Sequence, residues 1–503
     1  MRAPTPFPPG AVRAEGSRMR TVLHLSIGRH RAAARGGGAE RRRAWLAGMT
    51  LLATAVVLAG IGAPVAALDT SQISTTTLSN GMRVVLWPDH SIPNVALYTF
   101  FRVGSRNERP GITGLSHFFE HMMFLGSKSY APGEFDKVME AAGGANNAFT
   151  AQDITAYMDW FPRSALETIL TLEADRIAFL SIDPQSVESE RGVVTSERRR
   201  SVEDNNTRLL DEENWAAAYK AHPYQWPVIG WMVDIENWKI DDLRAYFKTY
   251  YAPNNATMVV VGDFEPTEML TAVRKHMEPI PKGPDPLPVT TAEPEQRGER
   301  RTELRKQAEL ATFVSSWHVP ATSHADYWPL RILESLLLQG ESSRLYRRLV
   351  DREQAALSVF GGFDYALDPT LFQVFVQVKN EYDPARCESL LYEEIDRLAQ
   401  EPPSEREVQK ARNQLAAAFY RSLETIGDKA LVLGRSDVYF GDPKAILESA
   451  GRFDKVTPDD VRRVARTYFT RDNRTVSVLV PVEEAAEQTQ GTGPAAGSTG
   501  GMQ

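Results

Sequence analysis

Residues 113–126 read TGLSHFFEHMMFLG, an apolar stretch that encloses two histidines and a glutamate. Apolar residues on all sides predict a buried helix across this range. His117 and His121 are four residues apart, so their imidazoles project from one helix face at a separation that a tetrahedral zinc ion can bridge. A lone buried histidine is more often a satisfied core residue. Two histidines with Glu120 between them are harder to explain in that way, because uncompensated buried polar groups are costly.

A second helix is expected to supply a third ligand in the form of a carboxylate. Asp183-Pro184 has the form of a helix cap followed by a first-turn proline. The helix that follows carries Glu190 and Glu197 two turns apart, with Val193 and Val194 between them on the same stripe. Such a stripe can face the protein interior only if a positively charged group lies there to pair with the carboxylates. For either glutamate alone, a solvated charged face is the alternative, since three arginines follow directly.

The two stretches together resemble the pitrilysin/insulinase family of zinc peptidases, whose inverted motif has the form HxxEH. HFFEH at 117–121 is followed by ERGVVTSE at 190–197, and the likeness extends over residues 75–480. The resemblance implies a zinc-dependent metalloendopeptidase, a hydrolase that acts on extended or unfolded peptides.

The resemblance also implies a role for each residue of the site. Zn²⁺ would be the cofactor, held by His117, His121 and Glu197, with Glu190 supporting a ligating histidine from behind. Glu120 would be the general base: zinc lowers the pKa of its water, Glu120 takes the proton, and the hydroxide attacks a polarised peptide carbonyl.

A glycine-rich segment is the candidate for substrate binding. Residues 143–150 read GGANNAFT and lead into a strand. A Gly-Gly turn taken alone is more often simple hairpin chemistry. The family resemblance makes this segment an edge strand onto which an extended peptide adds, with backbone contacts from Asn147 and Ala148 and a side-chain pocket lined by Phe149.

The chain repeats itself. Seven residues between Asp241 and Thr257 recur between Asp459 and Thr475 at a constant offset of 218 residues, and a second set recurs at an offset of 221. Several matches in the same order indicate duplication rather than chance. We therefore expect an α/β fold (α+β type) of two duplicated halves, each a mostly antiparallel sheet with helices packed on one face.

Composition shifts divide the chain into five parts. A basic arm and signal segment occupies 1–67, the zinc-binding catalytic half 68–283, a Pro/Glu/Gly-rich linker 284–300, the second half 301–482, and a Gly/Thr/Ala tail, expected to be disordered, 483–503.

The second half lacks the metal motif. Aligned through Gly340, it has Arg331, Glu334 and Ser335 in the places of His117, Glu120 and His121, respectively. This half therefore holds no second zinc site of the same kind, and we expect it to close a chamber over the first half.

The second half also lacks two substrate-binding residues that the resemblance implies. Active single-chain relatives carry an Arg and a Tyr seven residues apart in this half, where this chain has Val350 and Leu357. Tyr346 and Arg352 are nearby but out of register. We therefore expect a related partner chain to supply the missing Arg and Tyr, which would make this chain the metal-bearing subunit of a heterodimer.

Composition and charge exclude other classes of function. The formal charge of −8 includes about +8 on residues 1–43, which leaves about −16 on the rest of the chain. Such an acidic body argues against nucleic acid as a partner. Cys387 is the only cysteine, so neither an intrachain disulfide nor a thiolate cluster is possible.

The N-terminus has the form of an export signal. After the basic arm, residues 44–68 carry no charge and end in small residues, so cleavage after Ala67 and a periplasmic location are expected. The alternative is a membrane anchor formed by residues 44–67. Beyond that possible anchor, no membrane contact is expected. For the whole chain, the alternative to an enzyme is a non-catalytic assembly or scaffold subunit with the peptidase fold.

Overall fold

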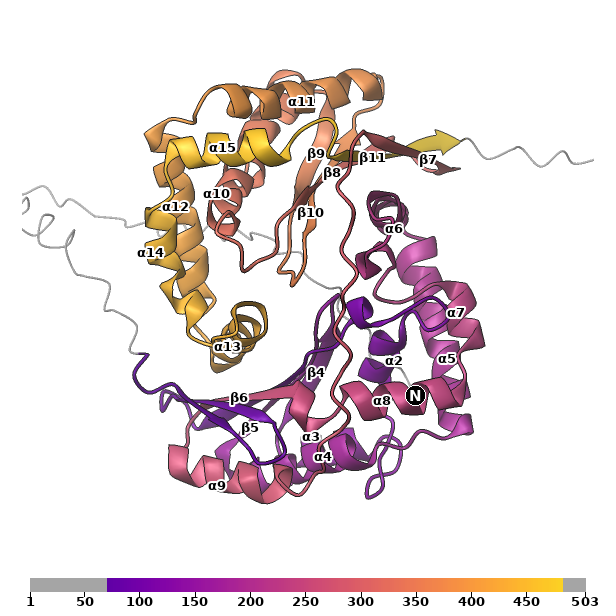
Figure 1. Ribbon diagram of the computed structural model, residues 1–503, viewed down its shortest axis with the longest axis vertical. Coiled ribbons are helices and arrows are strands. Elements are labelled where there is room, and N and C mark those ends of the chain that lie inside the picture. The colour runs from indigo at the N-terminus through magenta and orange to yellow at the C-terminus, as the bar shows by residue number, and fades with distance from the viewer. Residues whose placement is uncertain (1–69, 483–503) are drawn as a thin grey trace, which may run out of the picture. The chain divides into compact units, whose positions relative to one another are not determined.

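A computed structural model describes residues 70–482, which form two β-sheets with helices around them (Figure 1). The basic arm, the candidate signal and the C-terminal tail lie outside the described residues. The strands of the first sheet, in spatial order, are β1 (Ser74–Thr77), β2 (Arg83–Pro88), β6 (Ala256–Gly262), β3 (Asn94–Phe101), β5 (Thr155–Pro162) and β4 (Ala145–Thr150). Those of the second are β7 (Arg300–Gln307), β11 (Arg474–Val482), β8 (Thr312–Val319), β10 (Thr370–Val378) and β9 (Ala356–Gly362).

The two sheets share one topology. In each sheet a single neighbouring pair is parallel, β2 with β6 in the first and β7 with β11 in the second. The other neighbouring pairs are antiparallel. Taken in chain order, β2 to β6 occupy the same places as β7 to β11, and β1 is an additional edge strand of the first sheet. The predicted duplication is therefore confirmed.

Most helices of each half cover one face of its own sheet. The first half, from β1 to α9, contains α2 (Leu115–Met122), α3 (Glu134–Ala141), α4 (Leu166–Phe179), α5 (Pro184–Arg198), α6 (Asn206–Ala218), α7 (Met232–Asn237), α8 (Ile240–Tyr250) and α9 (Pro266–Met277). The second half, from β7 to β11, contains α10 (Tyr327–Leu338), α11 (Pro384–Gln400), α12 (Glu405–Arg421), α13 (Ile426–Phe440), α14 (Ser449–Asp454) and α15 (Pro458–Tyr468). Each half has a separate cluster of buried apolar side chains between its sheet and these helices. The predicted fold class is confirmed.

The duplication extends to single hydrogen bonds. After α8, the side-chain amide of Asn255 donates to the carbonyl of Tyr250 at 2.8 Å. After α15, Asn473 donates to the carbonyl of Tyr468 at 2.7 Å. Each asparagine thus satisfies a carbonyl at a helix C-terminus, which the helix itself leaves without a partner.

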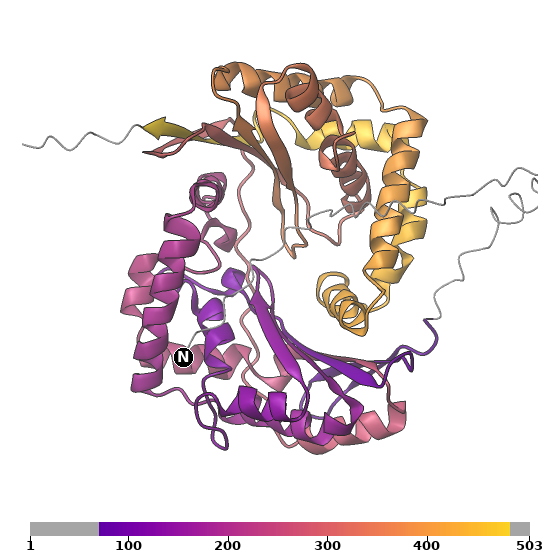
Figure 2. The ribbon, with the colours of Figure 1, turned by 180° about the vertical axis from the view of Figure 1, so that it is seen from behind.

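The two halves also exchange helices, which the sequence did not reveal. α6 of the first half packs on β11, β7 and β8 of the second sheet, and α13 of the second half packs on β6 and β3 of the first sheet (Figure 1, and from behind in Figure 2). Each helix covers the sheet face opposite that sheet's own helices. α6 follows α5 and α13 follows α12, so the two helices hold equivalent places in the duplicated halves.

Two glycines let α13 approach the first sheet. A Cβ on Gly434 would collide with the buried ring of Phe100, and a Cβ on Gly427 would lie 2.6 Å from the indole nitrogen of Trp160. Near the end of the helix, the buried carboxylate of Asp437 lies 2.6 Å from the guanidinium of Arg102. Because this carboxylate is paired across the contact, its burial is compensated, and the two halves are tied together by both packing and charge.

The segment between α9 and β7 contains no described helix or strand but is held at defined points. The carboxylate of Glu293 accepts hydrogen bonds from the backbone N–H groups of Lys220, Ala221 and His222 at 2.9 to 3.1 Å. The side-chain amide of Gln296 donates to the carbonyl of Arg474 at 2.7 Å. This connection therefore contacts both halves. Within residues 70–482, no helix is long and apolar enough to cross a bilayer.

Candidate metal centre

A buried glutamate fixes the start of α2, the helix that carries the motif. Gly114 precedes the helix with a φ of 88°, a conformation that favours glycine. The Glu108 carboxyl accepts from the N–H groups of Gly114 and Ser116, both at 2.7 Å. These N–H groups have no partner inside the helix. Burial raises the pKa of Glu108 to about 8, against the opposing effect of the two hydrogen bonds. The helix itself runs from Leu115 to Met122, shorter than the apolar stretch that predicted it.

α5 faces α2 with part of the stripe that the sequence predicted. Asp183 caps the helix by accepting from the N–H groups of Gln185 and Ser186. Glu190 is only 7% exposed and Val194 is fully buried. The stripe does not include Val193, which is 46% exposed. Inward-facing positions along a helix are separated by three or four residues, so two adjacent valines cannot both lie on one narrow stripe.

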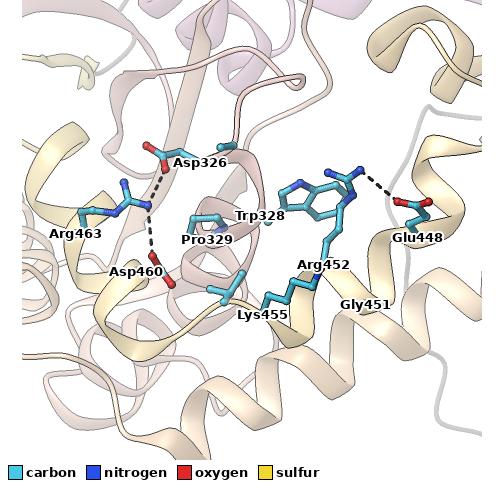
Figure 3. Close-up of a pocket in the computed structure, with 11 residues that line it drawn as sticks. Asp326, Trp328, Pro329, Glu448, Gly451, Arg452, Lys455, Asp460 and Arg463 are labelled. Carbon is cyan, nitrogen blue, oxygen red and sulfur yellow. Dashed lines mark hydrogen bonds and ion pairs between the residues drawn. The ribbon is translucent and has the colours of Figure 1, made fainter.

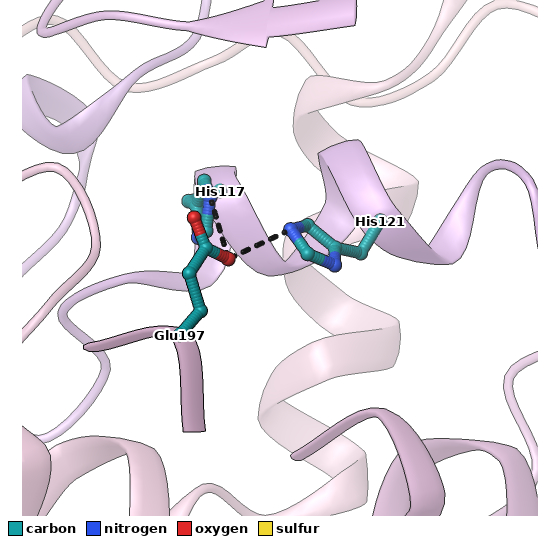
Figure 4. Close-up of side chains that lie close together, drawn as sticks. All are labelled: His117, His121 and Glu197. Atoms are coloured by element: carbon teal, nitrogen blue, oxygen red, sulfur yellow. Dashed lines mark ion pairs between the residues drawn. The ribbon is translucent and has the colours of Figure 1, made fainter. Parts of the chain in front are cut away.

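The structure brings His117, His121 and Glu197 together (Figure 4). One potential donor atom from each lies within 4.8 Å of the others. A carboxylate oxygen of Glu197 is 3.3 Å from His121 Nε2 and 3.8 Å from His117 Nε2. Tetrahedral zinc with bonds of about 2.0 Å needs donors about 3.3 Å apart. Two imidazoles and a carboxylate at this spacing fit a catalytic zinc ion, which uses three protein ligands and keeps one position open.

The electrostatics of the group favour a cation. Burial lowers the pKa of His117, so its imidazole is neutral and able to bind a metal. For His121, burial is outweighed by hydrogen bonds to Glu190 and Glu197, which raise its pKa to about 10. Burial likewise opposes ionisation of Glu197, but its contacts with the two histidines lower its pKa. The carboxylates of Glu190 and Glu197 beside His121 favour positive charge at this point, and a dication would compete with a proton for the imidazole.

Glu190 contacts the ring nitrogen of His121 that is not directed at Glu197. One of its carboxylate oxygens lies 2.8 Å from His121 Nδ1, so it fixes the ring while Nε2 faces Glu197. A carboxylate on the far nitrogen of a ligating histidine orients the ring and raises its basicity. The structure thus places Glu190 against the nitrogen of His121 that faces away from Glu197, and its role toward a metal remains a prediction.

Glu120 has a partner that the sequence analysis missed. Thr150, the last residue of β4, donates a hydrogen bond from its hydroxyl to a Glu120 carboxylate oxygen at 2.6 Å. The signal was present, because Thr150 ends the glycine-rich segment already assigned to substrate binding. Its contact with Glu120 depends on β4 lying beside α2, which residue patterns do not reveal.

Asn147, Ala148 and Phe149 lie on β4, which is an edge strand as expected. β4 pairs with β5 on one side and with no other strand among residues 70–482. The guanidinium of Arg435, on α13, lies 5.6 Å from the centre of the Phe149 ring. The second half therefore contacts this strand through the helix it contributes to the first sheet.

In the second half, α10 occupies the place of α2 without its metal-binding groups. Arg331 and Glu334 form an ion pair at 2.8 Å along this helix. Val350 lies in a π-helical segment (Tyr346–Arg352), and Leu357 is the extra residue of a bulge in β9, where it is 50% exposed. Within residues 70–482, no hydrogen bond or ion pair joins Tyr346 or Arg352 to the metal group.

A separate cavity of about 600 Å³ lies in the second half between α10, α14 and α15 (Figure 3). Its lining includes Trp328 and two ion pairs, Arg463 with Asp326 at 2.7 Å and Arg452 with Glu448 at 3.3 Å. It shares no lining residue with the metal group, so it is not part of this site.

Comparison with known proteins places the chain in a family. The family model for insulinase (peptidase family M16) matches residues 83–230, and that for the peptidase M16 inactive domain matches residues 237–415. Zinc protease PqqE of Helicobacter pylori is 30% identical over 81% of this chain and 92% of its own length.

Solved structures share this fold. A protease from Helicobacter pylori matches with a TM-score of 0.78 at 29% identity, over 81% of this chain and 99% of that one. The periplasmic protease PqqL of Escherichia coli matches with a TM-score of 0.69 at 18% identity, over 82% of this chain but 48% of its own. The resemblance inferred from the two motifs is thereby confirmed: the chain belongs to the insulinase (M16) family of peptidases.

Proposed function

We propose that the chain is the zinc-bearing subunit of a metalloendopeptidase that hydrolyses extended or unfolded peptides. The observation that carries this proposal is the convergence of His117, His121 and Glu197, with Glu120 on the same helix turn as the two histidines. The three side chains are partly buried and converge on one point, where a zinc ion would bind all three at once.

The residues of the site divide the work of peptide hydrolysis. When bound, zinc supplies a Lewis acid that polarises the scissile carbonyl and makes a water more acidic. Glu120 takes a proton from the attacking water and returns it to the leaving amine. The hydroxyl of Thr150 holds one oxygen of Glu120, which leaves the other oxygen free for proton transfer.

The free edge of β4 is the proposed binding site for the peptide substrate. An extended peptide adds to such an edge through backbone hydrogen bonds, for which Asn147 and Ala148 are the proposed partners. Phe149 is the proposed wall of a side-chain pocket. Because Thr150 ends this strand and contacts Glu120, a peptide on β4 passes close to the base.

Cleavage of a quenched peptide tests the proposed activity. Addition of a strong zinc chelator is expected to abolish cleavage, and added Zn²⁺ is expected to restore it, because the three ligands remain in place after the metal leaves. The assay should include any related chain from the same genome. Cleavage that persists in the chelator while the protein is shown to be metal-free would contradict the proposal.

The related partner chain remains part of the proposal. This chain matches about half the length of PqqL, which therefore contains about as much chain again. A second chain with an Arg and a Tyr in the places of Val350 and Leu357 would supply the corresponding part here.

The proposed location is outside the cytoplasm. PqqL is described as periplasmic, and residues 1–67 have the order of an export signal. N-terminal sequencing of the mature chain is expected to begin near Leu68. A mature chain that still carries residues 44–67 would support the membrane-anchor alternative instead.

A further inference from the structure

The helix that carries one of the proposed ligands leads into a helix that packs on the second half. Glu197 is the penultimate residue of α5, and Arg198 is the last. A π-helical segment (Arg199–Glu203) and then α6 follow directly. α6 is the helix that the first half contributes to the second sheet, so the ligand helix leads straight into an element mounted on the other half.

A buried ion pair joins the end of α5 to α6. Arg198 is 5% exposed, and its two terminal nitrogens donate to the two carboxylate oxygens of Glu212 at 2.9 and 2.8 Å. Two parallel charge-assisted bonds fix the relative orientation of the groups as well as their separation. The last turn of α5, with Glu197 in it, therefore has a position set by α6.

α6 is in turn held on the second sheet. Leu210 is fully buried in a cluster with three apolar side chains of that sheet, Val314, Phe375 and Leu479. On the same helix, the side-chain amide of the fully buried Asn214 donates to the hydroxyl of Ser477 at 3.3 Å. These contacts bind α6 to β8, β10 and β11.

Hydrogen bonds at both ends of α6 complete its attachment. At its start, the side-chain amide of Asn206 donates to the carbonyl of Gln307 at 3.0 Å. At its end, the guanidinium of Arg300 donates to the carbonyl of Ala217 at 3.0 Å and also to that of Ala218. Gln307 and Arg300 both belong to β7, so α6 is attached to the second half at its start, at its middle and at its end.

We propose that the second half sets the position of the third zinc ligand, Glu197. Glu212 is the positioning residue, because it lies on the helix bound to the second sheet and pairs with Arg198, the residue that follows Glu197. His117 and His121 are fixed within the first half by α2, whereas the last turn of α5 depends on this contact. The inference rests on the proposed zinc site. It gives the second half a role in metal binding although it has no ligand of its own.

The variant Glu212→Gln tests this role, because it keeps the shape of the side chain but removes the charge that pairs with Arg198. We expect the zinc dissociation constant to rise about tenfold to a hundredfold, as is typical when groups that orient ligands are altered. It is measured by competition with a chromophoric chelator at a temperature where circular dichroism shows the variant folded. The absorption spectrum of the Co²⁺-substituted protein is expected to change, because it reports coordination geometry.

Glu388→Gln is the control for the same chemical change at another ion pair. The Arg301–Glu388 pair has the same two-bond geometry, at 2.7 and 2.8 Å, but joins β7 to α11 inside the second half, and its arginine is more exposed than Arg198. This variant is expected to lose thermal stability while its zinc affinity and Co²⁺ spectrum stay unchanged. Loss of a buried partner can prevent folding. If Glu212→Gln does not fold, Glu212→Asp carries the test, because it keeps the charge but has a shorter reach, and its zinc dissociation constant is expected to rise by less than that of Glu212→Gln.

The outcomes separate this inference from the proposed function. A wild type that binds no zinc overturns the proposed function and with it this inference. A wild type that binds zinc, with Glu212 variants of unchanged affinity and Co²⁺ spectrum, overturns only the positioning role. Equal loss of zinc in the Glu212 and Glu388 variants also overturns it, because it would show a general effect of lost stability.

Discussion

Glu120→Gln is expected to bind zinc as the wild type does and to cleave peptides about a hundredfold to ten-thousandfold more slowly. The amide cannot take a proton from the attacking water, and general base catalysis typically contributes a factor of that size. The amide oxygen still accepts the hydrogen bond from Thr150, so the local structure is expected to persist. Turnover of a quenched peptide and the zinc content of the same preparation are the two measurements.

Glu140→Gln serves as the control for this substitution. Glu140 lies near the end of α3 and is exposed, so the same chemical change there should leave turnover and zinc content unaltered. A Glu120→Gln protein with unchanged turnover would remove Glu120 from the role of base.

The isolated chain is expected to be weakly active or inactive, and co-expression with a related chain from the same genome should raise turnover about a hundredfold or more. Val350 and Leu357 can neither donate a hydrogen bond from their side chains nor carry positive charge. Loss of one donor to a developing oxyanion typically costs about a hundredfold to a thousandfold in turnover. A partner with an Arg and a Tyr in these places would restore both donors.

The alternative is that Tyr346 or Arg352 of this chain takes the place of the missing Arg and Tyr, and the same assay tests it. If Tyr346 or Arg352 replaced the missing donors, Tyr346→Phe or Arg352→Ala would lower the activity of the isolated chain. If the isolated wild type is fully active and neither substitution lowers that activity, then the donors come neither from a partner chain nor from Tyr346 or Arg352. Bound zinc without cleavage, with or without a partner, would favour the scaffold alternative.

The sequence predicted the parts of the site that depend on local spacing. His117 and His121 share a helix face because they are four residues apart, and Asp183-Pro184 correctly marked the start of α5. The repeat at an offset of 218 residues correctly predicted two halves of one topology. These features follow from periodicity and capping, which act within a few residues of each other in the chain.

The sequence did not predict contacts between distant segments. Thr150 meets Glu120, and Arg198 meets Glu212, only because of how the elements pack. Three consecutive arginines at 198–200 gave no sign that the first is buried and the other two are exposed. The error at Val193 has a different origin, because two adjacent residues of a helix point in different directions and only one of the two valines could lie on the stripe.

The exchange of α6 and α13 between the halves was also outside the reach of residue patterns. Gly427 and Gly434 read as ordinary helix-weakening residues, and only the nearness of Trp160 and Phe100 shows why no larger side chain fits. The exchange connects the metal-free half to both the edge strand and the ligand helix, through Arg435 and Glu212.

The zinc content of the purified wild type and of His117→Ala tests the central claim most directly. Three protein ligands with one open position make a single catalytic site, so the wild type is expected to contain about one zinc per chain. His117→Ala removes one of the two imidazoles and is expected to lose most of this metal while it remains folded. Zinc retained at full occupancy in His117→Ala, or a wild type that takes up no zinc, would contradict the assignment of His117, His121 and Glu197 as ligands.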